Sequence, residues 1–123
     1  MTRPSLKKMT VAQLVECFTE IGIAQDRALL DDEISKFNRL FDEKTAILQE
    51  LKHRESDQRH ALITLYDHPN MQVRLNAAKA TLAVAPVAAR KMLQTIADSG
   101  WYPQAGDAGM SLVNLERGIF KPK

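Results

Sequence analysis

An alanine-rich segment between a turn and a proline narrowly limits the folds that this chain can adopt. Residues 67–86 read DHPNMQVRLNAAKATLAVAP. The apolar side chains fall on two neighbouring stripes at helical spacing, one consisting of Val73, Ala77, Ala80 and Val84 and the other of Leu75, Ala78 and Leu82. Such a face is too wide for a helix that touches only one partner. Because small side chains let helix axes come close, we predict that helix 71–84 forms the middle layer of a stacked helical array.

The first half of the chain predicts two longer helices. Helix 10–22 is expected to begin with a capping box, in which Thr10 and Gln13 exchange side chain to backbone hydrogen bonds, and to end at Gly22. A second helix is expected from about residue 25 to residue 54, either continuous or broken near residues 42–45. Its apolar seam consists of Leu30, Ile34, Phe37, Phe41, Leu48 and Leu51.

Proline, glycine and asparagine divide the second half into four shorter helices. These are expected over residues 57–66, over 71–84, from 86 to about 99, and over 103–117. Asn70 is expected to cap the helix that begins at residue 71, and Pro86 to open the next one. Glycines just past the last periodic residue, Gly100 and Gly118, are expected to end the final two helices.

No segment alternates apolar and polar residues long enough to predict a strand. The prediction is therefore an all-α chain of five or six helices, and 123 residues fit one domain. Residues 1–9 are expected to be a flexible tail of that domain, and Ile119 and Phe120 to fold back as an apolar lid. Residues 57–84 and 86–117 share a plan of two helices joined by a proline-containing turn, which is typical of helical repeats.

The segment HPNMQVRLNAAKATL resembles the turn and second helix of a HEAT repeat. The matching positions are Pro69, Asn70, Val73, Arg74, Ala77 and Leu82. The leucine falls one place later than in many HEAT repeats, and residues 104–112 lack the valine–arginine pair. The resemblance implies a short HEAT-like helical repeat, an α-α superhelix, over residues 1–123.

A wider resemblance extends over nearly the whole chain. Its three blocks are LVECFTEIGIAQDRALLDDEISKFNRLFDEK, VRLNAAKATLAVAP and ERGIFKP. In order and spacing they are similar to a small bacterial family known as domain of unknown function two thousand nineteen. This resemblance implies a compact HEAT-like domain with no assigned activity, and it supplies no catalytic residue.

Composition favours a cytoplasmic protein. The net charge is +2, which is too small a bias to indicate nucleic acid as the main partner. Cys17 is the only cysteine, so an internal disulfide is impossible and a reducing compartment fits the chain. No apolar run approaches the roughly 18 residues of a membrane span, and no apolar region follows the basic N-terminus as in a signal peptide.

One group of residues has the spacing of a metal site. His53, Asp57 and His60 would align if a single helix ran through them, and two histidines with a carboxylate can bind zinc. Arg54 and Arg59 crowd the same stretch, however, and the ligands of zinc must converge. We therefore favour a solvated connection over a metal site.

Two further features each have a functional and a structural interpretation. Asp31, Asp32 and Glu33 could supply a general acid and base, but a solvated group at the start of a helix is favoured. Cys17 is more readily an inert buried thiol than a reactive one, because no histidine is near it in sequence. The sequence therefore predicts no catalytic residue, no cofactor and no metal, and the protein is not expected to be an enzyme.

The candidate interaction surface combines basic and aromatic residues. Basic side chains that could line one face are Arg39, Arg74, Lys79, Arg90 and Lys91. Arg74 is favoured as a structural tie between adjacent turns rather than a ligand contact. Trp101 and Tyr102 lie in a loop, where they either cap the end of the stack, which we favour, or form a hot spot for a protein partner. The surface named for testing consists of Arg39, Arg74, Lys79, Trp101 and Tyr102.

These features predict a protein–protein interaction module, an adaptor or an inhibitor of another protein. The alternative is a weak nucleic-acid binder that uses the basic helical face. A homodimer is compatible with the sequence, because a short helical array leaves an apolar end to cover.

Overall fold

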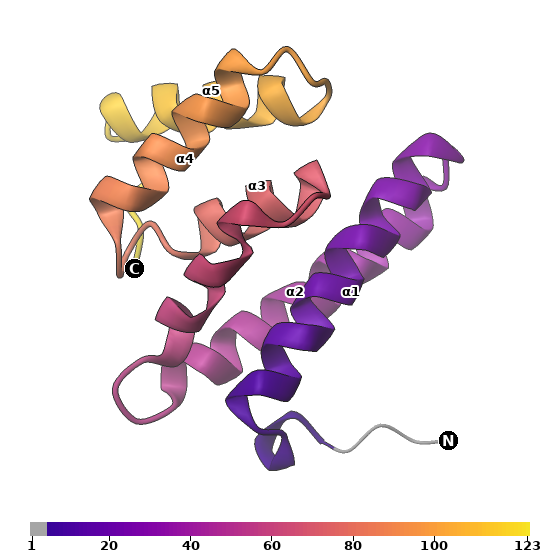
Figure 1. The fold of residues 1–123 in the computed structure, drawn as a ribbon, viewed down its shortest axis with the longest axis vertical. Helices are drawn as coiled ribbons and strands as arrows, with labels where there is room; N and C mark the ends of the chain where they lie inside the picture. The colour runs from indigo at the N-terminus through magenta and orange to yellow at the C-terminus, as the bar shows by residue number, and fades with distance from the viewer. Residues whose placement is uncertain (1–4) are drawn as a thin grey trace. The chain divides into compact units, whose positions relative to one another are not determined.

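A computed structural model describes residues 5–123 and contains, within them, helices and no strand (Figure 1). The elements are η1 (Leu6–Lys8), α1 (Val11–Leu30), α2 (Ile34–His53), η2 (Gln58–Asp67), α3 (Met71–Ala80), α4 (Pro86–Asp98) and α5 (Gln104–Glu116), where η denotes a 3₁₀ helix. The all-α prediction is confirmed. None of the helices in the described part of the chain combines the length and the apolar character needed to cross a membrane.

The chain forms two compact units, one ending at Ala61 and the other beginning at Leu62. In the first unit, α1 and α2 run antiparallel and contact each other along their length (Figure 1). Their buried apolar side chains include Leu14, Phe18 and Ile21 on α1, and Leu40, Ile47 and Leu51 on α2. The capping box is confirmed: the Gln13 amide donates to Thr10 Oγ1 over 3.1 Å, and the Thr10 amide donates to Gln13 Oε1 over 2.9 Å.

The predicted end of the first helix at Gly22 is wrong, because α1 continues to Leu30. Gly22 is buried in the helix interior, and Gln25 and Ala28 extend the buried face beyond it. A glycine inside a helix costs only about 1 kcal/mol relative to alanine, which this additional burial offsets. The acidic residues 31–33 therefore form the turn between α1 and α2, with Asp32 at a φ of 56° and Glu33 at the N-cap of α2.

The second helix is unbroken from Ile34 to His53, so the alternative of a break near residues 42–45 is excluded, but its predicted start near residue 25 is wrong because residues 25–30 belong to α1. Its predicted seam is correct at Leu51, which is buried, and wrong at Ile34 and Phe41, which are exposed. Leu40 and Ile47, which the seam left out, are buried. Lys44, which interrupted that seam, lies with Nζ 4.5 Å from the centre of the Phe41 ring. A cation over an aromatic face is stable in water, so Phe41 and Lys44 both belong to the solvent side of α2.

The flexible-tail prediction is wrong for residues 6–9, while residues 1–4 lie outside the described residues. Leu6–Lys8 form η1, and Met9 is buried. The guanidinium of Arg54, at the end of α2, donates from Nη2 to the Leu6 carbonyl over 3.0 Å and to the Met9 carbonyl over 2.8 Å. A side chain 45 positions away in sequence thus holds this segment in place.

In the second unit, α3 contacts both α4 and α5, and α4 packs antiparallel to α5 (Figure 1). The core cluster of this unit consists of Leu75, Ala78, Leu82, Ala89, Leu93, Ile96, Ala108 and Leu115. Ala77 and Ala78 have no exposed surface. The alanine-rich helix therefore packs against more than one partner, as its wide apolar face predicts.

Several boundaries of the second unit agree with the sequence. Asn70 Oδ1 accepts from the Val73 amide over 3.2 Å, Pro86 opens α4, and Gly100 and Gly118 adopt positive φ values of 70° and 71° after their helices. Two expectations differ. The segment expected as helix 57–66 is the 3₁₀ helix η2, and α3 ends at Ala80, four residues before the predicted end.

The early end of α3 has a local cause. Thr81 Oγ1 donates to the Ala77 carbonyl over 2.8 Å, and the Ala85 amide then bonds to the Thr81 carbonyl over 2.7 Å in a turn.

The prediction that Ile119 and Phe120 form an apolar lid is wrong. The amides of Ile119 and Phe120 fold back onto the Asn114 carbonyl, but both side chains are exposed.

Candidate interaction surface

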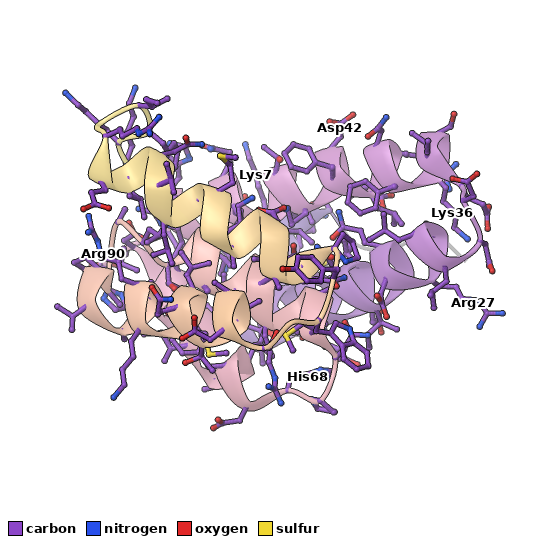
Figure 2. All side chains as sticks on the ribbon, turned by 90° about the horizontal axis from the view of Figure 1, so that it is seen from above. Lys7, Arg27, Lys36, Asp42, His68 and Arg90 are labelled. Carbon is purple, nitrogen blue, oxygen red and sulfur yellow. The ribbon has the colours of Figure 1, made fainter. Side chains whose placement is uncertain are left out.

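The five residues named from the sequence are divided between the two units. Arg39 is exposed on α2 of the first unit, near the turn to α1. It lines a shallow hollow with Asp32, Glu33 and Lys36, and Figure 2 shows Lys36 at this end of the α1–α2 hairpin. The other four residues, Arg74, Lys79, Trp101 and Tyr102, belong to the second unit. Arg39 therefore does not share a unit with the other four residues.

Arg74 has a structural role, as the sequence favours, because it connects α3 to the turn before it. Its Nε donates to the His68 carbonyl in the turn that precedes its own helix. In the same turn, the Asn70 amide donates to His68 Nδ1 over 3.0 Å. Arg74 is half-buried and its guanidinium is committed to this turn, so it contributes rigidity to the start of α3.

Lys79 and Asp107 join α3 to α5. Lys79 Nζ lies 2.9 Å from Asp107 Oδ1, and Ser111 Oγ donates to the same oxygen over 3.3 Å. Both members of the ion pair are exposed, so the pair contributes at most about 1 kcal/mol to stability. Of the remaining basic residues, Arg90 and Lys91 are exposed on α4, and Figure 2 shows Arg90 projecting from that helix.

Trp101 and Tyr102 lie in the loop between α4 and α5 with most of each side chain in solvent. Their exposed fractions are 62% and 73%. The backbone beneath them is held in place: the Trp101 amide donates to Ser99 Oγ over 3.1 Å, and the Trp101 carbonyl accepts from the Ala105 amide over 2.8 Å. The two rings are thus presented by a fixed loop and leave most of their apolar area uncovered.

The aromatic loop continues into one face of α5, which sequence reasoning missed. The Tyr102 ring lies against Gly106, where an added Cβ would be 3.6 Å from Cδ1 and Cε1 of the ring. Met110 and Val113 follow at steps of four and three residues and are 61% and 40% exposed. We call Trp101, Tyr102, Gly106, Met110 and Val113 the α5 face. The signal was present in the sequence, since Gly106, Met110 and Val113 lie opposite the buried stripe of α5.

A row of buried amide side chains lies between α3 and the start of α5. Gln104 Nε2 donates to Gln72 Oε1 over 3.0 Å, and Gln72 Nε2 donates to Asn76 Oδ1 over 2.9 Å. All three residues are buried. Buried amide bonds are directional, so this row fixes where α5 begins relative to α3, and with it the position of the Trp101–Tyr102 loop.

The three residues considered for a metal site do not converge. His53 Nδ1 lies 2.8 Å from the Gln49 carbonyl, whereas His60 Nδ1 lies 3.3 Å from the Asp57 carbonyl. The Asp57 carboxylate pairs with Arg59, at 2.9 Å and 2.7 Å, and this pairing lowers the pKa of Asp57. Across residues 5–123, no cluster of three histidine, cysteine, aspartate or glutamate side chains could hold a metal ion.

Comparison with known proteins places the chain in a family. Residues 12–116 match the family model described as Domain of unknown function (DUF2019). The chain belongs to this family. A DUF2019 assignment confirms the resemblance seen in the three sequence blocks. No curated protein matches the chain.

One solved structure is similar over the full length of this DUF2019 chain. It is the crystal structure of the protein RPA1889 from Rhodopseudomonas palustris CGA009, which shares 55% sequence identity. The match covers 98% of this chain and 100% of that chain, with a TM-score of 0.95. The all-α fold is therefore shared with a bacterial protein of known structure.

Proposed function

We propose that this DUF2019 protein is a non-enzymatic protein–protein interaction module, an adaptor or an inhibitor, that binds its partner through the α5 face. The observation that carries the proposal is the exposure of four large apolar side chains, Trp101, Tyr102, Met110 and Val113, along one helix and its leading loop. Scattered apolar residues are normal on a surface, but a continuous patch indicates a binding site.

The composition of the α5 face suits a helical partner. Tryptophan and tyrosine are the residues most enriched at interface hot spots, and methionine adapts its shape to an opposing surface. Gly109 has no side chain and open space lies above it, whereas the Tyr102 ring covers Gly106. A partner helix could therefore lie close to the backbone of α5, with apolar residues at positions i, i+3, i+4 and i+7 toward it.

The supporting contacts make this face rigid before binding. The Lys79–Asp107 pair and the Gln72–Gln104 hydrogen bond both connect α3 to α5. A surface that is already ordered loses less conformational entropy when a partner binds. These contacts therefore favour binding without contributing partner contacts of their own.

We also propose that η2–α3 and α4–α5 are two HEAT-like helical pairs. The support is the contact of α3 with both helices of the following pair, the Asn70 cap, and the bond from Arg74 to the preceding turn. The first helix of the first pair is 3₁₀ instead of α-helical, which departs from the usual repeat. A cytoplasmic location and a homodimer remain predictions of the sequence.

Nucleic-acid binding through a basic face is the weaker alternative. Arg74 bonds to a backbone carbonyl and Lys79 pairs with Asp107, so two of the five basic residues already have protein partners. Catalysis has still less support. The pKa values of Asp57 and Tyr66 are displaced, but the causes are an ion pair with Arg59 and burial against the core, both of which are structural.

The test is a charge placed in the middle of the α5 face. The partner is first captured from native lysate with the full chain, then purified and titrated against Met110→Asp. Because a buried aspartate loses its hydration without gaining a partner, we expect affinity to fall about 30-fold, the size of a hot-spot loss. Hydrogen exchange in the complex should show protection concentrated in residues 101–113.

The matched control is Val87→Asp. Val87 is an exposed apolar residue in the first turn of α4, where a negative charge is compatible with the helix dipole. This variant should bind the purified partner as the unchanged protein does. Equal binding by Met110→Asp, or the absence of any stoichiometric partner, would overturn the proposal.

A further inference from the structure

The first unit contains a cavity of about 200 Å³ beside η1. Leu6 and Met9 form one wall, Cys17 and Ile21 of α1 form the second, and α2 contributes the third through Glu43, Ala46 and Ile47. Met9, Ile21 and Ile47 are almost completely buried and still border this space. An apolar cavity of roughly 150 Å³ is large enough for benzene, so this one can hold an aromatic ring with a short substituent.

The wall formed by η1 is held in place by hydrogen bonds. Arg54 donates to the carbonyls of Leu6 and Met9, and its Nε pairs with Glu50 Oε2 at 2.6 Å. The side chains of Arg54 and Glu50 are mostly buried, and a bond between charged groups in such a setting is stronger than an exposed one. The cavity is therefore a preformed site rather than a gap that would close by collapse of the N-terminal segment.

The lining identifies the chemical class of ligand. The side chains around the cavity are apolar except for the thiol of Cys17 and the carboxylate of Glu43. Glu43 has no ion-pair partner among the residues that the structure describes. An apolar body fits the methionine and isoleucine walls, and a cationic group would pair with this carboxylate.

We propose that the cavity binds a small arylalkyl or alkyl amine, with its apolar part against Met9, Ile21 and Ile47 and its ammonium group at Glu43. The methionine side chain adapts to ligands of different outline. The binding is noncovalent and involves no change in the thiol of Cys17. This site is independent of the proposed function of the α5 face, because every residue that lines it belongs to the first unit.

The cavity can be tested with 2-phenylethylamine as the probe and the full chain as the receptor. Titration followed by amide NMR should give saturable shifts confined to residues 6–9, 17–21 and 43–47, with half-saturation at roughly 0.1–1 mM for a ligand of this size. Cys17 is the only cysteine, so its rate of modification by a thiol reagent provides a second readout, which the bound amine should slow.

Three variants separate binding in the cavity from nonspecific binding. Ala46→Phe places a ring in the cavity from a position that is itself exposed, and should abolish the shifts; Ala12→Phe, the same change at an exposed α1 position that does not line the cavity, should leave them unchanged. Glu43→Gln should weaken binding of the amine by about 3- to 5-fold, the size of an exposed ion pair, while binding of ethylbenzene, the uncharged counterpart of the amine, stays unchanged.

The opposite results would each overturn the proposal. Absence of saturable shifts at 10 mM amine, or identical binding by Ala46→Phe and the unchanged protein, would show that the cavity is not the site. Equal affinity for the amine and ethylbenzene, with no effect of Glu43→Gln, would show that the amine class is wrong. Because Glu43 is exposed, this variant tests the proposal even if Ala46→Phe fails to fold.

Discussion

Tyr66 shows how the burial of one residue produces a pH dependence of stability. Its ring packs against the core of the second unit, and its hydroxyl lies 2.5 Å from Thr81 Oγ1. Burial raises the pKa of Tyr66 above 10.0, and the Thr81 bond opposes this to a smaller extent. The folded state therefore holds the phenol proton more tightly than the unfolded state. The stability that this difference contributes is complete below pH 10 and is lost as the pH rises through the pKa of Tyr66 in the folded state.

Tyr66→Phe should therefore reduce the loss of stability at high pH. At pH 8 we expect a cost of about 1 kcal/mol for the lost hydrogen bond, and between pH 9 and pH 11 a smaller decline than that of the unchanged protein. Urea denaturation at a series of pH values measures both. Tyr102→Phe is the control, because that side chain is exposed; identical pH profiles for the two variants would contradict the assignment.

Arg54 is the residue on which the position of the N-terminal segment depends. Arg54→Ala leaves the carbonyls of Leu6 and Met9 without their donor, at a cost of about 1–3 kcal/mol. Hydrogen exchange should accelerate at the Lys8 and Met9 amides, which bond within η1, more than in α4. Arg54→Lys keeps the charge but lacks the planar fork, so it should restore only part of the protection; unchanged exchange in Arg54→Ala would refute this role.

At the scale of elements, the helix ends that local chemistry determines were predicted correctly. The Thr10–Gln13 capping box, the Asn70 cap and the glycine after α5 each satisfy backbone groups with residues a few positions away. Such signals are contained in short stretches of sequence. Gly22 was misleading because the same residue type is tolerated inside a helix when the helix face on both sides of it is buried.

The N-terminal cap of α3 gives a direct test at this scale. Asn70→Ala removes the acceptor for the Val73 amide and should destabilise the protein by about 1 kcal/mol. Asn70→Asp keeps an acceptor at the same position and should change the stability by a few tenths of a kcal/mol at most. Thermal denaturation at pH 7 measures both variants. Equal destabilisation by the two substitutions would show that the cap bond is not the cause.

The register of α2 required information beyond its own sequence. Two stripes that both reach Leu51 compete: the predicted seam through Phe41, and the stripe through Leu40 and Ile47 that is buried. Local spacing allows both, and only the helix packed opposite decides between them. For the same reason, the α5 face was recognised only in part: Trp101 and Tyr102 are conspicuous in the sequence, whereas the exposure of Met110 and Val113 depends on which side of α5 packs inward.

At the scale of the whole molecule, the prediction of a single domain can be tested against the two compact units. A unit of about 60 residues buries only roughly 60% of its unfolded surface and is marginally stable alone. We therefore expect one cooperative transition. Leu14→Ala in the first unit removes a fully buried side chain, and should cost about 2–5 kcal/mol.

Hydrogen exchange in mild denaturant distinguishes the outcomes. If the chain unfolds as one domain, Leu14→Ala accelerates hydrogen exchange in α4 as much as in α1. Leu93→Ala removes a buried leucine of α4 and should likewise accelerate hydrogen exchange equally in α1 and α4. Acceleration confined to the unit that carries the substitution would show that the two units unfold independently, and the single-domain prediction would then be wrong.

The helical character of this chain, the starts of most of its helices and the alanine-rich face of α3 could all be predicted, because each follows from the residue types and spacing within a short stretch of sequence. Tertiary structure decided the rest. The attachment of η1 by Arg54, the buried row of Gln72, Asn76 and Gln104, the side of α2 that is buried, and the exposed side of α5 all depend on partners far away in sequence. Side-chain spacing defines a face, but only the helix packed against it determines whether that face is core or surface.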